Sequence, residues 1–302
     1  MLRRVALITL LAVLALAAYV LLGLPGRGQV RALAQTNPGV TSVMRQREAE
    51  ARAAGRTPQR RQSWVPLGRI SRHLVQAVLA SEDQKFFGHQ GIDWEAIEKS
   101  AKEDRERWSF ARGGSTITQQ LAKNLFFTTH KSVVRKLREL VAARWLEADL
   151  GKARILELYL NVIEWGDGVY GAEAAAERYY GKPAASLDAD EAAGLAGMIP
   201  NPRRINPRVD GSRFARAQRR VVWLMAHAGF LNRPGLGAEP PPEPVEEDEP
   251  AVAEVERPEP PRASVPPAGT EAPPSAPAST PAAEPPNERA PRPTPEPSPS
   301  PV

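Results

Sequence analysis

The chain has 302 residues, a net charge of +5 and no cysteine, which excludes disulfide bonds and thiol catalysis. The charge is unevenly spread, because the residues from Pro234 onward include 13 acidic and 4 basic side chains and so leave +14 on residues 1–233. A body this basic indicates an anionic partner, which composition alone leaves open as nucleic acid, a phospholipid surface or a phosphate-bearing substrate.

The N-terminal region contains an uncharged apolar stretch over residues 5–24, VALITLLAVLALAAYVLLGL. At about 1.5 Å per residue, a helix of this length spans the roughly 30 Å hydrocarbon core of a bilayer. Arg3 and Arg4 precede it, so the positive-inside rule predicts a cytoplasmic stub over residues 1–4 and a transmembrane anchor over 5–24. A cleavable signal peptide is the alternative, with Ala32-Leu33-Ala34 as its cleavage pattern, but signal cores are usually shorter.

The body of the chain shows helical spacing of its apolar residues. A connecting segment over residues 25–36 and a helix-compatible run over 41–55 precede a region of sustained periodicity from Trp64 to Leu231. Ser71 is a predicted N-cap, and Ser115 opens the second of these helices. Helices are predicted within residues 70–87, 115–127, 132–150, 152–163, 172–181, 188–199 and 212–230. Strand signals are sparse, so the predicted fold class is mainly α.

Residues 233–302 have a different composition, rich in Pro, Ala, Glu and Ser. Such a segment cannot bury enough apolar surface to offset the entropy of folding. We therefore expect a disordered proline-rich tail, partly in the polyproline II conformation.

Two acids lie in contrasting surroundings. Glu82 ends an apolar helix, where partial burial would raise its pKa, whereas Glu139 lies among Arg135, Lys136 and Arg138. These cations would hold Glu139 ionised and would also bind phosphate. Two carboxylates in dissimilar settings suit a division of acid and base roles. The residues alone leave a plainer alternative open, in which Glu82 is a solvated helix end and Glu139 an intrahelical partner of Arg135.

Several motifs occur in a familiar order: ASEDQKFFGHQGID, RGGSTITQQLAKNLF, RKLRE and KARILELYLN, with WVPLGRIS before them and MIPNPRRINP after them. Together they resemble the peptidoglycan glycosyltransferases of glycosyltransferase family 51, which polymerise lipid II, and in particular the monofunctional members. The resemblance covers about residues 37–231. It implies a lysozyme-like glycosyltransferase domain, placed at residues 37–232, with a smaller membrane-associated jaw lobe.

The resemblance also implies roles for individual residues. Glu82 matches the general base for the 4-hydroxyl of the acceptor GlcNAc, and Glu139 matches the acid that assists departure of undecaprenyl pyrophosphate. Because the donor linkage is α and the product β-1,4, a single inverting displacement is implied. Lys131 stands where the family commonly has arginine, which keeps the charge but loses the bidentate fork. The implied substrate-binding residues are Asp83, Ser115, Gln119, Gln120, Lys123, Asn124, Lys131, Arg135 and Arg138.

No cofactor is required by the resemblance, although a divalent cation, Mg or Mn, could bridge the pyrophosphate and Glu139. Four histidines scattered along the chain do not suggest a metal site formed by protein alone. The implied partners are lipid II, the growing lipid-linked glycan and the bacterial inner membrane, with the catalytic domain on the periplasmic side. The tail could recruit proteins of cell-wall synthesis or division. Nucleic acid is not among the expected partners.

Two other functions remain open at this point. A muramidase or lytic transglycosylase would share the helical architecture and a catalytic Glu, but it would not need the Gln-Gln-x-x-Lys-Asn helix or the basic motif around Glu139. A non-catalytic envelope protein would have the tail as its working part. We expect glycan synthesis without transpeptidation, because about seventy residues follow the body and the chain holds no Ser-x-x-Lys motif.

Overall fold

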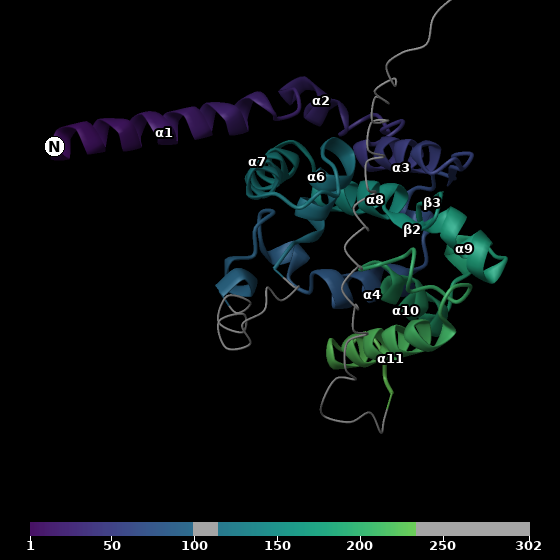
Figure 1. Cartoon of the computed structure of the whole chain (residues 1–302). Coiled ribbons are helices and arrows are strands. Elements are labelled where there is room, and N and C mark those ends of the chain that lie inside the picture. The colour runs from purple at the N-terminus through teal and green to yellow at the C-terminus, as the bar shows by residue number, and fades with distance from the viewer. Residues whose placement is uncertain (99–113, 234–302) are drawn as a thin grey trace, which may run out of the picture. The chain divides into compact units, whose positions relative to one another are not determined.

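A computed structural model describes residues 1–98 and 114–233 (Figure 1). Within these residues the fold is mainly helical, which confirms the predicted class. The helices are α1 (Leu2–Leu22), α2 (Arg27–Ala32), α3 (Ser42–Ala53), α4 (Arg72–Glu82), α6 (Ile117–Phe126), α7 (Val133–Asp149), α8 (Lys152–Val162), α9 (Ala172–Tyr180), α10 (Ala189–Met198) and α11 (Gly211–His227). Short 3-10 turns lie at Leu67–Arg69, Phe86–Gly88 and Ala184–Ser186.

Side-chain caps determine where the central helices begin. Ser71 caps α4 as predicted, with its Oγ accepting a hydrogen bond from the His73 N–H at 3.2 Å. The prediction that Ser115 opens the next helix is wrong by one residue, because Thr116 Oγ1 accepts from the Gln119 N–H at 3.2 Å and caps α6. An N-cap residue satisfies one of the free N–H groups of the first turn.

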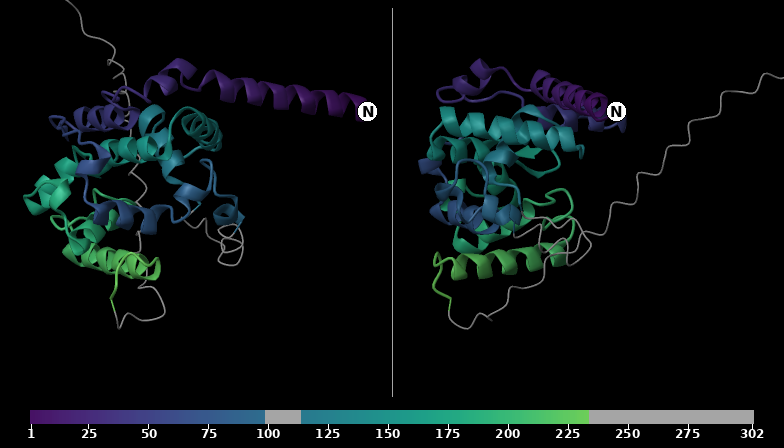
Figure 2. Two further views of the ribbon diagram at one scale, coloured as in Figure 1. Left: turned by 180° about the vertical axis from the view of Figure 1, so that it is seen from behind. Right: turned by 90° about the vertical axis from the view of Figure 1, so that its left-hand side faces the viewer.

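The helices form two packed groups that share one hydrophobic core. In the first group α4, α10 and α11 pack together, and in the second α6 packs against α3, α7 and α8 (Figures 1 and 2). A single cluster of buried apolar side chains runs through both groups and includes the fully buried Leu74, Leu121, Tyr159 and Trp165. This core fixes α4 and α6 relative to each other.

A small sheet lies beside these helices. Its strands are β1 (Arg61–Gln62), β2 (Glu164–Gly166) and β3 (Val169–Tyr170), in the order β1-β3-β2. β1 pairs with β3 in parallel, and β2 pairs with β3 antiparallel with an irregularity between Glu164 and Gly166. These strands are too short to produce the alternation by which a strand is recognised in sequence.

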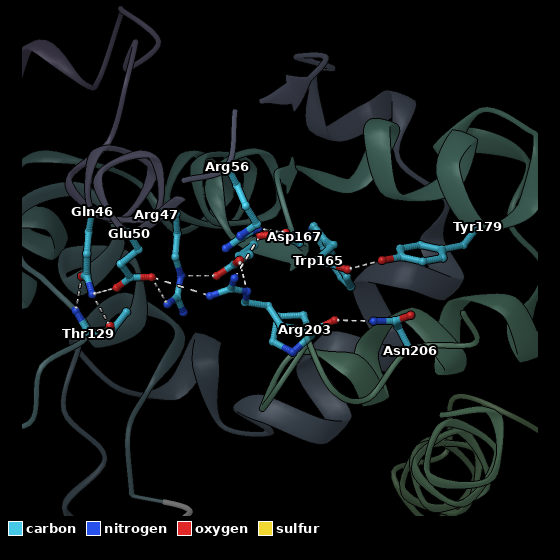
Figure 3. A network of polar contacts seen from close by, with 12 residues as sticks. Gln46, Arg47, Glu50, Arg56, Thr129, Trp165, Asp167, Tyr179, Arg203 and Asn206 are labelled. Carbon is cyan, nitrogen blue, oxygen red and sulfur yellow. Dashed lines mark hydrogen bonds and ion pairs between the residues drawn. The ribbon is translucent and has the colours of Figure 1, made fainter. Parts of the chain in front are cut away.

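A network of ion pairs attaches α3 to this sheet (Figure 3). Arg47 donates from Nε to Glu164 Oε2 and from Nη1 to Glu50, each at 2.9 Å. Arg203, from the loop before α11, lies 3.8 Å from Glu164 Oε1 and donates to Asp167 Oδ1 at 3.1 Å. Glu164 is buried, so its charge depends on the two arginines for compensation.

The same helix α3 also holds the loop that follows α6. Gln46 donates from Nε2 to Thr129 Oγ1 at 2.7 Å and accepts from the Thr129 N–H at 2.8 Å (Figure 3). This pair of hydrogen bonds fixes the connection between α6 and α7, the two helices that carry most of the predicted site residues.

Helix α1 is the one helix in the described residues that is long and apolar enough to cross a membrane, over Arg3–Leu22 with a mean hydropathy of 2.8. Its C-terminal end contacts α7. Arg138 donates to the carbonyl oxygens of Tyr19 and Val20, at 2.6 and 3.2 Å, and its guanidinium lies 4.9 Å from the Tyr19 ring centroid. The predicted disorder of the proline-rich tail concerns residues 233–302, of which 234–302 lie outside the described residues.

Candidate active site

Glu82 is the last residue of α4 and is half-buried. Its Oε2 accepts a hydrogen bond from Gln120 Nε2 on α6 at 2.7 Å. Burial raises the pKa of the Glu82 carboxyl, while this hydrogen bond and the charge of Lys123 act in the opposite direction. The raised pKa expected from the sequence is therefore present, and it suits a group that must accept a proton near neutral pH.

Asp83 connects the end of α4 to the start of α6. Its Oδ2 accepts from the Ile117 N–H at 3.0 Å, and its Oδ1 lies 2.9 Å from His89 Nε2. The Gly91 N–H donates to His89 Nδ1 at 3.1 Å, so the ring proton is on Nε2 and points to Asp83. Burial raises the pKa of Asp83, against the effects of these hydrogen bonds. In this geometry Asp83 holds the scaffold together, and its role as a substrate ligand stays a prediction.

The turn at Gly91 requires glycine. Its φ is +84°, and a Cβ there would lie 3.0 Å from Glu147 Cγ and 3.3 Å from the Ala143 carbonyl oxygen. The Gly91 carbonyl accepts from Thr116 Oγ1 at 2.7 Å and from Gln119 Nε2 at 3.2 Å. The loop after Glu82 is thereby fixed against the first turn of α6.

The amides predicted to line the cleft have different environments. Gln119 is buried, and its Oε1 accepts from Lys136 Nζ at 2.8 Å. Asn124 is also buried and donates to the Gln120 carbonyl at 2.8 Å, within α6. Gln120 is the one of the three that reaches a predicted catalytic acid.

Glu139 lies in α7 and is only 3% exposed. It forms an ion pair with Arg135, one turn earlier, and Lys136 Nζ lies 3.7 Å from its Oε2. Burial raises the pKa of Glu139, whereas Arg135, Lys136 and Lys123 lower it. The sequence-based view that cations govern this acid omitted the larger effect, which is burial.

Lys123 connects the two acids electrostatically. Burial lowers its pKa, and attraction to Glu139 and Glu82 opposes that shift. Within residues 1–98 and 114–233 its ammonium group makes no hydrogen bond or ion pair of its own. A cation of this kind can receive an anionic group of a substrate.

Two predicted residues are not brought to this cluster. Arg138 is adjacent to Glu139 in sequence, but its guanidinium is bound to the carbonyls of α1. Lys131 is exposed in the loop before α7. Their predicted contacts with substrate stay predictions.

Of two further residues at the site, Lys136 was expected from the sequence as one of the cations around Glu139, and Tyr159 was not predicted. Lys136 donates to Ser115 Oγ at 2.7 Å as well as to Gln119. Tyr159 of α8 donates to Gln120 Oε1 at 2.9 Å. No signal in the sequence distinguishes Tyr159 from an ordinary core aromatic.

No group of three or more His, Asp or Glu side chains gathers as a metal site in the part of the chain that the structure describes. Glu139 forms ion pairs with Arg135 and Lys136 of α7, and it would be the protein ligand of a metal bridged by a phosphate-bearing substrate. The predicted Mg or Mn ion stays a prediction.

The structure therefore contains a helical domain with two acids in unlike environments and a lysine attracted to both. The model of the Transglycosylase family matches residues 49–227, which contain every residue of this cluster. The chain therefore belongs to the Transglycosylase family.

Curated relatives agree with this assignment. The biosynthetic peptidoglycan transglycosylase of Dechloromonas aromatica is 53% identical over 167 residues, which cover 55% of this chain and 72% of the relative. The protein of the same name from Thiobacillus denitrificans is 47% identical over 199 residues, covering 66% and 84%. That from Aromatoleum aromaticum is 45% identical over 192 residues, covering 64% and 83%. The family and the enzyme class predicted from the motifs are thus confirmed.

Proposed function

We propose that this enzyme polymerises lipid II into β-1,4-linked glycan strands with inversion at the donor carbon, releases undecaprenyl pyrophosphate and has no transpeptidase activity. The observation that carries the proposal is the pairing of Glu82 with an amide donor and of Glu139 with cations, with Lys123 attracted to both. The names of the relatives support the substrate class.

Glu82 acts as the base in this proposal. It takes the proton from the 4-hydroxyl of the acceptor GlcNAc as that oxygen forms a bond to the anomeric carbon of the donor MurNAc. The raised pKa of Glu82 makes the carboxylate a stronger base than an exposed glutamate. The bond from the anomeric carbon to the pyrophosphate oxygen breaks, and its electron pair leaves with the pyrophosphate.

The cations around Glu139 stabilise the leaving group. Lys123, Lys136 and Arg135 carry the positive charge, and the ion pair between Arg135 and Glu139 holds the guanidinium in place. Preorganised charges of this kind favour the transition state without reorganisation during the reaction. A bound Mg or Mn ion held by Glu139 would add charge neutralisation to the same pyrophosphate.

The membrane supplies the substrate in this proposal. Helix α1 has the length and hydropathy of a bilayer span, and the body of the chain is basic. We place the N-terminal stub in the cytoplasm and the catalytic domain at the periplasmic face of the inner membrane, where an anionic lipid-linked sugar would be retained near it. The proline-rich tail is proposed to recruit other proteins of cell-wall synthesis or division.

The test is polymerisation of purified lipid II by the full chain in detergent, with Glu82→Gln as the variant. Loss of a general base typically lowers the rate by about 10²–10⁴-fold. Glu177→Gln changes an exposed glutamate on α9 and is the matched control, expected to behave like wild type. Products are separated by size, and cross-linked peptides are assayed in parallel.

Two results would contradict the proposal. One is the absence of polymer from wild type combined with release of soluble muropeptides from sacculi, which would favour a lytic enzyme. The other is a Glu82→Gln variant that polymerises lipid II at the wild-type rate. Cross-linked peptide in the products would contradict only the absence of transpeptidation.

A further inference from the structure

A hydrogen-bonded chain leads from the protein core to Glu82. Tyr159 on α8 is 0% exposed, and its hydroxyl lies 2.9 Å from Gln120 Oε1. Gln120 Nε2 lies 2.7 Å from Glu82 Oε2. Two hydrogen bonds therefore link three side chains, one each from α8, α6 and α4.

The direction of these hydrogen bonds follows from their chemistry. An amide oxygen only accepts, so the Tyr159 hydroxyl donates to Gln120 Oε1. The amide nitrogen then faces Glu82 and donates to the carboxylate. If the amide were rotated by half a turn, its oxygen would face a second acceptor, which an ionised carboxylate does not tolerate.

The tyrosine is a permanent donor at this position. Burial, together with the charges of Glu82 and Asp83, raises the pKa of Tyr159 well above its usual value, so the hydroxyl keeps its proton over the working pH range. The Ser115 carbonyl is 3.5 Å from Gln120 Nε2 and offers only a weak competing acceptor. Tyr159 is thus the group that decides which end of the Gln120 amide meets Glu82.

We propose that Tyr159 is a positioning residue for the glycosyl transfer, because it fixes the Gln120 amide in the orientation that donates to Glu82 and keeps this base ionised. The proposal deepens the proposed function and rests on Glu82 being the base. Tyr159 does not touch the substrate, and it acts only through Gln120.

Other charges face Glu82 and set the background for a pH measurement. Lys123 from α6 lowers the pKa of Glu82, and Asp83, next to it on α4, raises it. Asp83 is itself attracted to His89 and Lys152. A substitution at Tyr159 changes none of these groups, so a shift in the pH profile of the rate reports on the orientation of the Gln120 amide.

Tyr159→Phe removes the donor and keeps the ring in the core. The amide oxygen then loses its partner, and the amide can turn to accept from a protonated Glu82, which raises the pKa of the base. Since only the ionised base is active, the acid limb of the profile of kcat/KM moves to higher pH. A loss of one hydrogen bond to the ionised form corresponds to about one pH unit, or about tenfold in rate on that limb.

The experiment measures lipid II polymerisation by the full chain in detergent across pH for wild type, Tyr159→Phe, Gln120→Ala and the double variant. We expect Tyr159→Phe to recover most of the wild-type rate at high pH, and to add no further shift in the Gln120→Ala background. Tyr179→Phe is the matched control, because that hydroxyl donates to the Trp165 carbonyl at 2.9 Å and makes no contact with Gln120.

An unshifted profile for Tyr159→Phe, whether the rate is unchanged or reduced equally at every pH, would overturn the proposal and leave Tyr159 a structural residue. An additive shift in the double variant would overturn it too, because Tyr159 would then act independently of Gln120. Failure of the proposed function is recognised separately, because the Glu82→Gln variant would then remain active. The role of Tyr159 would fail with it, because that role rests on Glu82 being the base.

Discussion

At the scale of single residues, the stretch from Glu82 to Gly91 contains the proposed base and the residues that hold it in place. Asp83 accepts from the start of α6 and from His89, and His89 accepts from Gly91. The contacts of His89 with Asp83 and Gly91 join residues that are close in sequence, whereas the contact of Asp83 with Ile117 spans 34 residues. The position of Glu82 therefore depends on the contacts of the loop that follows it as well as on helix α4.

We predict that Asp83→Ala lowers the stability of the chain by about 2 kcal/mol, because the Ile117 N–H and the His89 ring N–H lose their acceptor in a buried setting. Denaturant unfolding in detergent measures this. Asp188→Ala, which removes the exposed cap of α10, is the control and should cost about 1 kcal/mol. A stable Asp83→Ala protein with a raised KM would instead support the substrate-binding role expected from the sequence.

The sequence indicated Glu82 and Glu139 as candidate acids, but it did not indicate which contacts the amides of α6 make. Gln119 and Gln120 are adjacent, and helical spacing cannot tell which one packs inward until the loop at Gly91 and the helix α7 are in place. The role of Tyr159 could not be predicted either, because Tyr159 lies within an apolar helix and its partner Gln120 is 39 residues away. Tertiary packing decides both cases.

At the scale of secondary-structure elements, α3 connects the sheet to the loop after α6. The helix itself was predictable from the run over residues 41–55. The contacts of Arg47 with Glu164 and of Gln46 with Thr129 were not, because these partners lie more than 80 residues away. In the ion pair between Arg47 and Glu164, the two charges contribute unequally to the stability of the fold. Burial raises the pKa of Glu164 despite its arginines, whereas pairing with Glu164 and Glu50 outweighs burial at Arg47 and raises its pKa.

An asymmetry between two substitutions follows from these directions. A raised pKa at Glu164 means that the folded state favours the neutral form, so Glu164→Gln should change stability by less than about 1 kcal/mol at neutral pH. Arg47→Met removes a charge that the folded state favours and leaves the buried Glu164 poorly compensated, which should cost about 3 kcal/mol.

The pH dependence checks the sign of this argument. Without Arg47 the pKa of Glu164 in the folded state rises further, so the associated stability is present below the unfolded pKa and lost as pH rises through the folded value. Arg47→Met should therefore be closest to wild type at acid pH and diverge as pH increases, measured by denaturant unfolding in detergent. Equal losses for both variants at neutral pH would contradict the assignment.

At the scale of the whole molecule, α7 has two functions on one helix. Arg138 binds the carbonyl end of α1, and the next residue, Glu139, is the acid proposed to assist the leaving group. Further along, Asp149 accepts from Arg27 of α2 at 3.0 Å. The N-terminal helix and the proposed leaving-group site thus share one support.

We predict that Arg138→Met lowers the rate of lipid II polymerisation in proteoliposomes about fivefold, as expected for the loss of roughly 1 kcal/mol of hydrogen bonding at this joint. In detergent micelles, where no bilayer holds α1, the loss should be smaller. Arg208→Met is the matched control, because Arg208 donates to the Arg178 carbonyl at 3.0 Å elsewhere in the domain. Equal losses in liposomes and detergent would place Arg138 in the substrate site instead.

The joint at Arg138 also relates catalysis to the physical state of the lipid. A helix whose apolar length differs from the hydrocarbon thickness adjusts by tilting. If α1 spans the bilayer as proposed, its tilt is transmitted through the carbonyls of Tyr19 and Val20 to a point one residue from Glu139. Under this proposal, the thickness of the bilayer would influence the position of Glu139.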